Sequence, residues 1–237
     1  MSKVLEVQNN MLRLVITSIT RFWYMTGRND MTTKEKITEE ALTLFAEKGY
    51  KGTSVKNIAD AVGIKDASLY NHFKSKQEIF DSIVELISKH ISELSIILGV
   101  PQYDKPGCTV SDFFTRLDLA GLKKITRESF VFYLTDPYIS RFWRIAQMEQ
   151  YVNPQIYTMF RKIFMEDAIS YQEKLFKELM KQGVFYPGDA RATAISFYSP
   201  IYLLLSMYSN QPERKEEALE VLDRQIEEFF RIYRKKD

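Results

Sequence analysis

The chain has 237 residues, of which 45% are hydrophobic and 27% charged, and its formal net charge is +2 at pH 7. This length and apolar content are enough for a full core and predict a small domain followed by a larger one. The single cysteine, Cys108, excludes an internal disulfide and is typical of a reducing, cytoplasmic compartment. With two histidines and no Cys/His cluster, phosphate-binding glycine loop or nucleophile elbow, the composition argues against an enzyme, and no metal or cofactor is expected.

The first 30 residues do not share the pattern of the rest. Residues 11–25 are mostly apolar but are interrupted by Arg13 and Arg21, so the stretch is too short and too charged to span a bilayer. A signal peptide is not expected either, because no uninterrupted apolar region and no small-residue cleavage site are present. Met31 is a more natural start, and one interpretation of residues 1–30 is a weakly ordered leader or an over-extended reading frame.

Residues 33–52 predict a supporting helix. Ile37, Ala41, Leu44 and Phe45 recur on one stripe, which is the spacing of a helix with one buried face. Gly49 is expected to end this helix.

Residues 53–76, TSVKNIADAVGIKDASLYNHFKSK, predict two short helices joined by a tight turn. Thr53 or Ser54 can cap the first helix, because a hydroxyl oxygen accepts a backbone N–H that a helix start leaves unpaired. Gly63 can take the left-handed conformation that ends this helix without steric cost.

The second short helix is predicted from about Asp66 to Phe73. Leu69 and Phe73 lie four residues apart on its inner face. The polar side chains of Lys65, Ser68 and Asn71 are therefore left outward, where they could reach the edges of bases.

The charge of this region favours a nucleic-acid partner. From Lys51 to Lys76 the chain has five lysines against two acidic residues, a net +3. The span from Ser54 to Phe73 is therefore interpreted as a DNA-reading helix-turn-helix. The alternative is a small helical hairpin that only packs a core.

The segment from Lys34 to about Leu86 resembles the TetR-type (TetR/AcrR) family of bacterial transcriptional regulators. The resemblance rests on Phe45, Gly49-Tyr50, Thr53-Ser54-Val55, Ile58-Ala59, Gly63-Ile64, Leu69-Tyr70-Asn71-His72-Phe73 and Ser75-Lys76. It implies a DNA-binding domain over residues 31–76, or to about residue 92 as the family domain is usually drawn. Residues 1–30 could then be an arm that reaches DNA through Arg21 and Arg28.

The resemblance also implies which side chains meet DNA. Hydroxyl, phenol, imidazole and ammonium groups are phosphate donors, and the candidate phosphate contacts are Thr53, Ser54, Tyr70, His72, Lys74 and Lys76. The outward face of the second motif helix would enter the major groove, and the candidate base contacts are Lys65, Asp66, Ser68 and Asn71.

Two positions depart from the family pattern. Lys65 stands where the family usually has a serine, and Ala67 where it often has glycine. Lysine cannot cap a helix start, so Asp66 is expected to take that role, which would shift the first turn by one residue. Lys65 could instead contact O6 or N7 of a guanine.

Beyond the motif, one long amphipathic helix is predicted, ending before the proline-rich loop that starts near Gly99. The region from Val110 to Gly183 then predicts several helices rich in aromatic residues and methionine. By resemblance it holds an inducer pocket for an apolar or planar molecule. The candidates for its lining are Phe114, Tyr133, Trp143, Met148, Tyr151, Met159, Phe160, Phe164 and Tyr171. The alternative for each is ordinary core packing.

Two apolar helices are predicted at the carboxyl end, one after Asp189 and one from about Glu213 to Tyr233. By resemblance they pair with their copies in a second chain. The candidate interface residues are Ile195, Tyr198, Tyr202, Leu205, Leu222, Ile226, Phe229 and Tyr233. The alternative is that both helices only close the core of one chain.

Together these patterns predict an all-α fold of about nine helices, with a three-helix DNA-binding domain followed by a larger helical ligand-binding and dimerisation domain over residues 77–237. The predicted function is a homodimeric repressor that binds a palindromic operator in double-stranded DNA and is released by a small-molecule effector. An activator of the same fold is the first alternative. A helical protein-interaction adaptor is the second.

Overall fold

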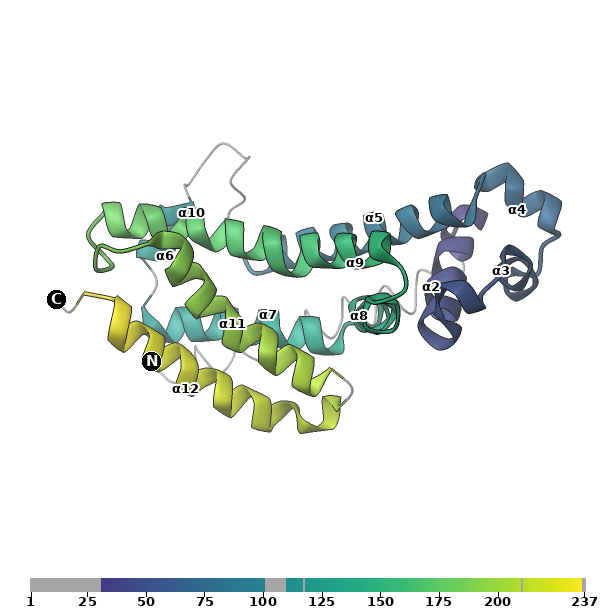
Figure 1. Ribbon diagram of the computed structural model, residues 1–237. Helices are drawn as coiled ribbons and strands as arrows, with labels where there is room; N and C mark the ends of the chain where they lie inside the picture. The colour runs from purple at the N-terminus through teal and green to yellow at the C-terminus, as the bar shows by residue number, and fades with distance from the viewer. Residues whose placement is uncertain (1–30, 101–109, 117, 210, 236–237) are drawn as a thin grey trace. The chain divides into compact units, whose positions relative to one another are not determined.

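The computed structural model describes residues 31–100, 110–116, 118–209 and 211–235. Within these ranges the chain forms eleven α-helices, and an isolated antiparallel bridge joins Phe185 to Arg234 (Figure 1). The predictions for residues 1–30 and for Cys108 lie outside the described residues. The chain divides into two compact units, one ending at Ile83 and one beginning at Val84, here called the head and the body.

The head is built from three helices and the start of a fourth. These are α2 (Thr33–Gly52), α3 (Val55–Val62), α4 (Asp66–His72) and the first two turns of α5 (Lys76–Ile97). The hydroxyl of Thr32 accepts the Glu35 N–H while the Glu35 carboxylate accepts the Thr32 N–H, so both orphan donors of the α2 start are satisfied. At Gly49 the backbone leaves helical geometry, with φ 76° and ψ 161°, where the sequence predicted the end of the helix.

The core of the head collects the apolar stripe of each helix. Ile37 and Phe45 of α2, Ile58 of α3 and Leu69 of α4 are fully or almost fully buried, and Phe80 of α5 joins them. Burial of one such side chain stabilises the fold by about 1.5–3 kcal/mol. Only the apolar sides of α3 and α4 pack on this core, so the polar sides of these two helices remain exposed to solvent.

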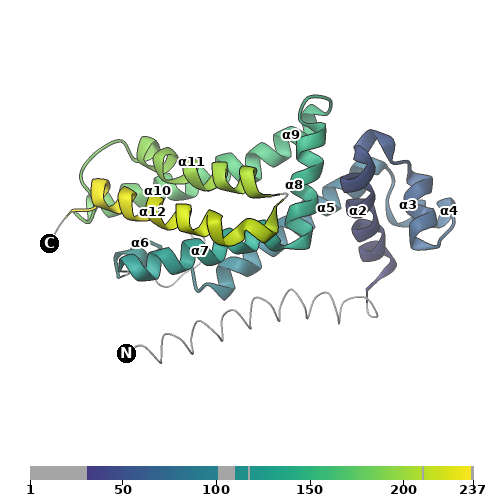
Figure 2. The same ribbon diagram turned by 90° about the horizontal axis from the view of Figure 1, so that it is seen from below.

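The body contains the second half of α5 and the remaining helices. They are α6 (Val110–Thr115), α7 (Leu119–Thr135), α8 (Pro137–Glu149), α9 (Pro154–Arg161), a π-helical segment (Lys162–Glu166), α10 (Asp167–Lys181), α11 (Ala190–Tyr208), a 3-10 turn (Pro212–Arg214) and α12 (Lys215–Tyr233). Within this unit α11 packs between α10 and α12, and α12 also lies along α7 (Figure 2). The core of the body therefore sits where these four helices meet.

Among the described helices, none combines the length and the apolar character needed to cross a bilayer. The same part of the chain has no group of three or more His, Cys, Asp or Glu side chains arranged to hold a metal ion.

Candidate nucleic-acid interface and ligand cavity

The α3–α4 pair has the local geometry of a tight two-helix turn. The Ser54 hydroxyl accepts the Asn57 N–H at 3.1 Å, and the Asn57 side-chain oxygen accepts the Ser54 N–H at 2.9 Å, which caps α3 in both directions. Gly63 ends α3 in the left-handed region, with φ 77°. The N–H of Ile64 then donates to the Ala59 carbonyl at 3.0 Å, a closing bond typical of a glycine C-cap. Of the two predicted caps, Ser54 is the one used.

One side of α4 is buried and the other is open to solvent. Leu69 and Phe73 are each 1% exposed, as their spacing predicted. Tyr70 is 46% exposed although it is a large aromatic residue. The other exposed polar residues on and beside this helix are Lys65, Asp66, Asn71, His72 and Lys74, while Ser68 is half-buried. A small helix thus presents a phenol, an amide, an imidazole and two ammonium groups outward.

The start of α4 corrects one prediction. Lys65 occupies the N-cap position without a side-chain cap, and the helix begins at Asp66. The Lys65 carbonyl accepts N–H groups from Ser68 at 2.9 Å and from Leu69 at 3.1 Å, so backbone bonds alone set this start. The prediction that Asp66 caps the helix and shifts the first turn is therefore wrong.

Two predicted phosphate contacts are instead used inside the head. Thr53 is fully buried, and its hydroxyl lies 3.0 Å from the Gly49 carbonyl and 3.2 Å from the Leu44 carbonyl. The Lys76 ammonium donates to the carbonyls of Tyr50 at 2.8 Å and Thr53 at 3.0 Å and lies 4.3 Å from the centre of the Tyr50 ring. Both side chains therefore contact backbone carbonyls in the last turns of α2 and at its junction with α3. In this structure both side chains therefore have bracing contacts inside the head, and their assignment to DNA phosphates stays a prediction.

Ser54 and Ser75 are likewise engaged at helix starts. The exposed Ser54 hydroxyl donates to the Asn57 side-chain oxygen at 2.8 Å. The Ser75 hydroxyl accepts the Glu78 N–H at 3.1 Å, and the Glu78 carboxylate accepts the N–H of Lys74. Tyr70, His72 and Lys74 are thus the predicted phosphate contacts whose side chains are exposed and free of these capping roles.

The body encloses a cavity of about 370 Å³. Its wall is formed by α5, α6, α7, the π segment, α10, α11 and α12, and is mainly apolar. Four of the predicted pocket residues line it, namely Phe114, Tyr133, Phe164 and Tyr171. This volume lies in the range of small-molecule sites.

The other predicted pocket residues lie away from the cavity wall. Trp143 packs its ring against Phe160 and Tyr202, with centroids 4.9 Å and 5.4 Å away. Tyr151 is 89% exposed and Met148 is 41% exposed. Trp143, Met148, Tyr151, Met159 and Phe160 are therefore corrected to core or surface positions, because composition alone does not give the direction of a side chain on its helix.

Polar groups are sparse in the cavity wall, and two were not predicted. The side-chain oxygen Oε1 of Gln172 is buried without a hydrogen-bond partner. The Tyr198 hydroxyl donates at 2.6 Å to the carbonyl of Phe164, inside the π segment. Burial raises the pKa of Tyr133 to about 12 and that of Tyr171 to about 12, and burial raises the pKa of Tyr198 as well. These phenols are neutral at physiological pH.

The predicted dimer contacts divide into two groups. Leu222, Ile226 and Phe229 of α12 are at most 7% exposed within one chain. Tyr198 and Leu205 line the cavity. Leu222, Ile226 and Phe229 also line a groove between α11 and α12. Tyr202 and Tyr233 are half-buried and Ile195 is 42% exposed, and the assignment of all eight residues to a dimer interface stays a prediction. The open apolar side chains that the spacing did not single out are Leu203 and Met207 on α11 and Ile232 on α12.

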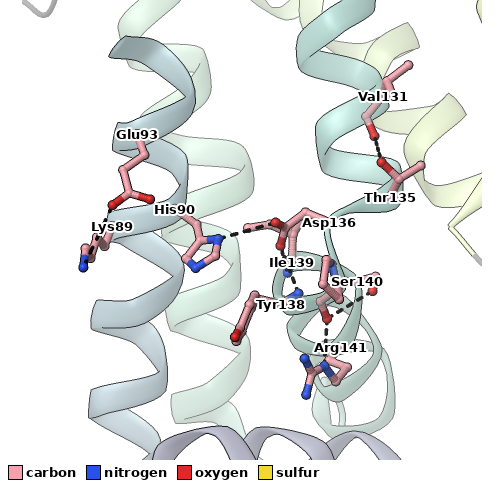
Figure 3. Close-up of polar contacts among 11 residues, drawn as sticks. Lys89, His90, Glu93, Val131, Thr135, Asp136, Tyr138, Ile139, Ser140 and Arg141 are labelled. Carbon is pink, nitrogen blue, oxygen red and sulfur yellow. Dashed lines mark hydrogen bonds and ion pairs between the residues drawn. The ribbon is translucent and has the colours of Figure 1, made fainter. Parts of the chain in front are cut away.

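A buried polar contact fixes α5 inside the body (Figure 3). One Asp136 oxygen accepts the N–H groups of Tyr138 and Ile139, each at 2.9 Å, and caps α8. The other lies 3.4 Å from Nδ1 of His90 on α5, and these two residues are 2% and 6% exposed. The His90 ring also packs on Tyr138, with centroids 4.5 Å apart. The helix that crosses from head to body is therefore tied to the start of α8.

Curated relatives match about a quarter of the chain. The biofilm operon icaADBC HTH-type negative transcriptional regulator IcaR of Staphylococcus aureus (strain Newman) is 46% identical over 61 residues, which are 26% of this chain and 33% of IcaR. IcaR of Staphylococcus epidermidis is 52% identical over 52 residues, 22% of this chain and 28% of that protein. The chain thus spans about a third of the length of the curated relatives it matches.

Solved structures match the fold over most of the chain. SmeT, the repressor of the Stenotrophomonas maltophilia multidrug efflux pump SmeDEF, has a TM-score of 0.61 at 20% identity and covers 87% of this chain and 92% of its own. A SmeT–triclosan complex has a TM-score of 0.64 at 19% identity, with 86% and 92% covered. The flavonoid-responsive regulator FrrA has a TM-score of 0.59 at 22% identity, with 86% and 98% covered. At these identities the likeness shows the fold.

The family model for bacterial regulatory proteins of the tetR family matches residues 37–83, the segment that contains α3, α4 and the core of the head. The likeness to the SmeT structures extends beyond this segment into the helical body. The chain is therefore similar to the tetR family of bacterial regulatory proteins over residues 37–83, and it shares the fold of the solved structures named above.

Proposed function

We propose that this protein binds operator DNA as a homodimer, represses transcription and is released from DNA by a small molecule. The observation that carries the proposal is the exposed polar side of α4 over a buried Leu69–Phe73 seam. Because the apolar side of α4 is packed in the head, its exposed side can enter a major groove without any rearrangement of the core of the head. Repression is the favoured sense because IcaR and SmeT are described as a negative regulator and a repressor. The compartment of such a protein is the cytoplasm.

The DNA contacts follow from which side chains are exposed. Tyr70, His72 and Lys74 are assigned to phosphates, because their donors are exposed next to the end of α4. Lys65, Asp66, Ser68 and Asn71 are assigned to base edges. Lys65 at the N-cap has a long cationic side chain and would contact guanine, whereas Asn71 has the amide geometry suited to adenine.

The dimer would form through the open side of α11. Ile195, Leu203 and Met207 lie at spacings of eight and four residues, so they fall on one stripe of the helix. A groove beside this stripe runs between α11 and α12 and is lined in part by Pro200 and Ile232. A second copy covering this stripe would place two heads for successive major grooves, about 34 Å apart.

The effector would act through α5. Its first turns belong to the head, and Ile91, Leu94, Ser95 and Leu98 at its other end line the cavity. A ligand that prefers the body conformation incompatible with operator spacing would lower DNA affinity by its differential binding free energy. The relatives described with triclosan and as flavonoid-responsive support a small, largely apolar effector.

Binding to duplex DNA from upstream of the protein's own gene tests the proposal. Fluorescence anisotropy should detect specific binding that weakens steeply as salt increases. Tyr70→Phe should weaken binding to every duplex, whereas Asn71→Ala should change the order of preference among operator variants. Tyr151→Phe, an exposed tyrosine in the body, is the matched control and should bind as the wild type does. A dimer that retained neither this duplex nor random duplex at low salt would rule out the regulator.

An activator with the same DNA site is the alternative. If the protein is a repressor, a strain that lacks its gene should transcribe the adjoining genes more strongly than the wild-type strain does. A fall in transcription would assign it as an activator and leave the DNA contacts unchanged.

A further inference from the structure

Ala67 occupies the middle of the outward side of α4. Leu69 points into the core of the head and is 1% exposed. An α-helix turns by about 100° per residue, so Ala67 and Asn71, each two residues from Leu69, lie about 160° from it around the helix axis. Both residues are exposed. Their side chains are therefore the ones on α4 that point most directly away from the core of the head.

The flanks of α4 carry different side chains from its middle. Tyr70 is one residue from Leu69 and so lies about 100° from it, on a flank. When a helix enters a major groove, its flanks are nearest to the sugar–phosphate strands and the middle of its outward side is nearest to the base edges. This agrees with the assignment of Tyr70 to a phosphate and of Asn71 to a base. It also brings Ala67, one helical turn before Asn71, onto the base edges.

The chemistry of the alanine side chain limits what it can read. Its methyl group has no donor or acceptor, and the C5-methyl of thymine is the apolar group on the major-groove edges of the bases. Contact between the two methyl groups removes apolar surface from water, which is favourable. The same methyl placed over the amino group of a cytosine would cover a donor without pairing it, which is unfavourable. An exposed alanine at the middle of α4 therefore favours thymine.

We propose that Ala67 is a specificity-determining residue that contacts the C5-methyl of a thymine in the operator, beside the base that Asn71 contacts. This inference rests on the proposed DNA-binding function and names the chemical group that one further position of α4 recognises. It predicts that the protein distinguishes two bases that pair identically and differ only in this methyl group.

Replacement of thymine by 2′-deoxyuridine tests the proposal, because deoxyuridine pairs with adenine as thymine does but lacks the C5-methyl. The probe is the duplex from upstream of the protein's own gene, with the thymines replaced one at a time. Fluorescence anisotropy with the full-length protein should show at least one thymine whose replacement weakens binding about fourfold, the effect of one buried methyl group. Wild-type affinity that no replacement changes would overturn the proposal.

A pair of alanine variants locates the contact. In Ala67→Gly the ratio of thymine affinity to deoxyuridine affinity at this position should fall to about one. Comparing the two duplexes within one variant removes any effect of glycine on helix stability. Ala61→Gly makes the same change at an exposed position of α3 and should keep the fourfold ratio. A fourfold ratio that persists in Ala67→Gly would assign the methyl contact to another residue and refute the role of Ala67.

A second substitution covers the case in which Ala67→Gly does not fold. Ala67→Ser keeps the Cβ atom but adds a hydroxyl, which gains nothing from a methyl group, so the preference for thymine should again be lost. A preference that Ala67→Ser retains in full would refute the contact.

The same titrations separate this inference from the proposed function. A wild type that binds the duplex specifically, but binds every deoxyuridine duplex equally well, would refute the thymine contact and keep the regulator. A wild type that retains no duplex DNA would refute both.

Discussion

The head and the body differ in where the polar groups of their candidate sites lie. In the head, Tyr70, Asn71 and His72 are exposed on a helix whose other side is buried. In the body, Gln172, His90 and Asp136 have polar atoms inside. Exposed donors can meet a polyanion without first losing a stabilising contact, whereas a buried polar atom must be paired by the fold or by a ligand. This difference is consistent with the proposal that the exposed side of α4 binds DNA and that the cavity of the body binds a small molecule.

The strongest test of the body's interior pairing is Asp136→Ala. The variant removes two bonds that cap α8 and the carboxylate beside His90, so the free energy of unfolding should fall by about 3 kcal/mol. Urea titration followed by circular dichroism measures this loss. Asp118→Ala is the matched control, because Asp118 caps α7 from an exposed position through one bond to the Gly121 N–H, and it should lose only about 1 kcal/mol. Equal losses in the two variants would contradict the buried pairing.

In the head, Lys76→Met tests whether the Lys76 ammonium stabilises the fold or binds a DNA phosphate. The variant removes two bonds to carbonyls beside the Gly49 break and the contact with the Tyr50 ring, so the head should lose about 2 kcal/mol of stability. Hydrogen exchange of α2 and α3 amides reports it. The exposed Lys51→Met should change stability by no more than about 0.5 kcal/mol. If the α2 and α3 amides of Lys76→Met exchange as in the wild type while DNA binding weakens, Lys76 is a phosphate contact and does not stabilise the head.

A smaller effect of opposite sign is expected for Gln172→Leu in the body without ligand. Replacing an unpaired buried oxygen by an apolar group should raise the free energy of unfolding by about 1 kcal/mol. Differential scanning calorimetry of the ligand-free protein would register a higher Tm. A lower Tm would mean that the glutamine already has a partner in the folded protein.

The last expected effect appears only at alkaline pH. Burial raises the pKa of Tyr133 from an ordinary 10.0 to about 12. Above pH 10 the unfolded chain loses this proton while the folded chain keeps it, so the stability that is fully present below pH 10 is lost as the pH rises toward 12. Tyr133→Phe should therefore lose less stability than the wild type between about pH 10 and about pH 12. Equal slopes in the two proteins would place the Tyr133 hydroxyl in contact with water.

Much of the head could be predicted from sequence because its signals are local. The Ser54 cap, the Gly63 turn and the Leu69–Phe73 spacing lie within one short segment, and each constrains the backbone next to it. Thr53 and Lys76 could not be placed in the same way. A hydroxyl or an ammonium can donate to a phosphate or to a backbone carbonyl. Only the folded structure shows that carbonyls at the end of α2 and at its junction with α3 lie within reach of these two side chains.

The cavity was harder to predict because its wall comes from seven helical segments. Tyr133 and Phe164 were singled out by type, but Trp143 is of the same type and faces a different neighbour. A single glutamine on an amphipathic helix is usually a surface residue, so no sequence signal pointed to Gln172. On α12 the spacing of Leu222, Ile226 and Phe229 identified a buried stripe, but not whether this chain or a second copy covers it.

The π segment sets the phase between the two helices that flank it. In this segment the Asp167 N–H donates to the Lys162 carbonyl, five residues back, so the turn holds one residue more than an α-helical turn. Each residue of an α-helix advances the chain by about 100° around the axis. Deleting one residue between 162 and 166 would therefore rotate α9 against α10 by roughly that angle. Phe160 could then not pack on Trp143 while Tyr171 lines the cavity. The extra residue of the π segment thus allows α9 and α10 to direct their apolar sides differently within one continuous helical run. Changing the length of the π segment would therefore change the lining of the cavity.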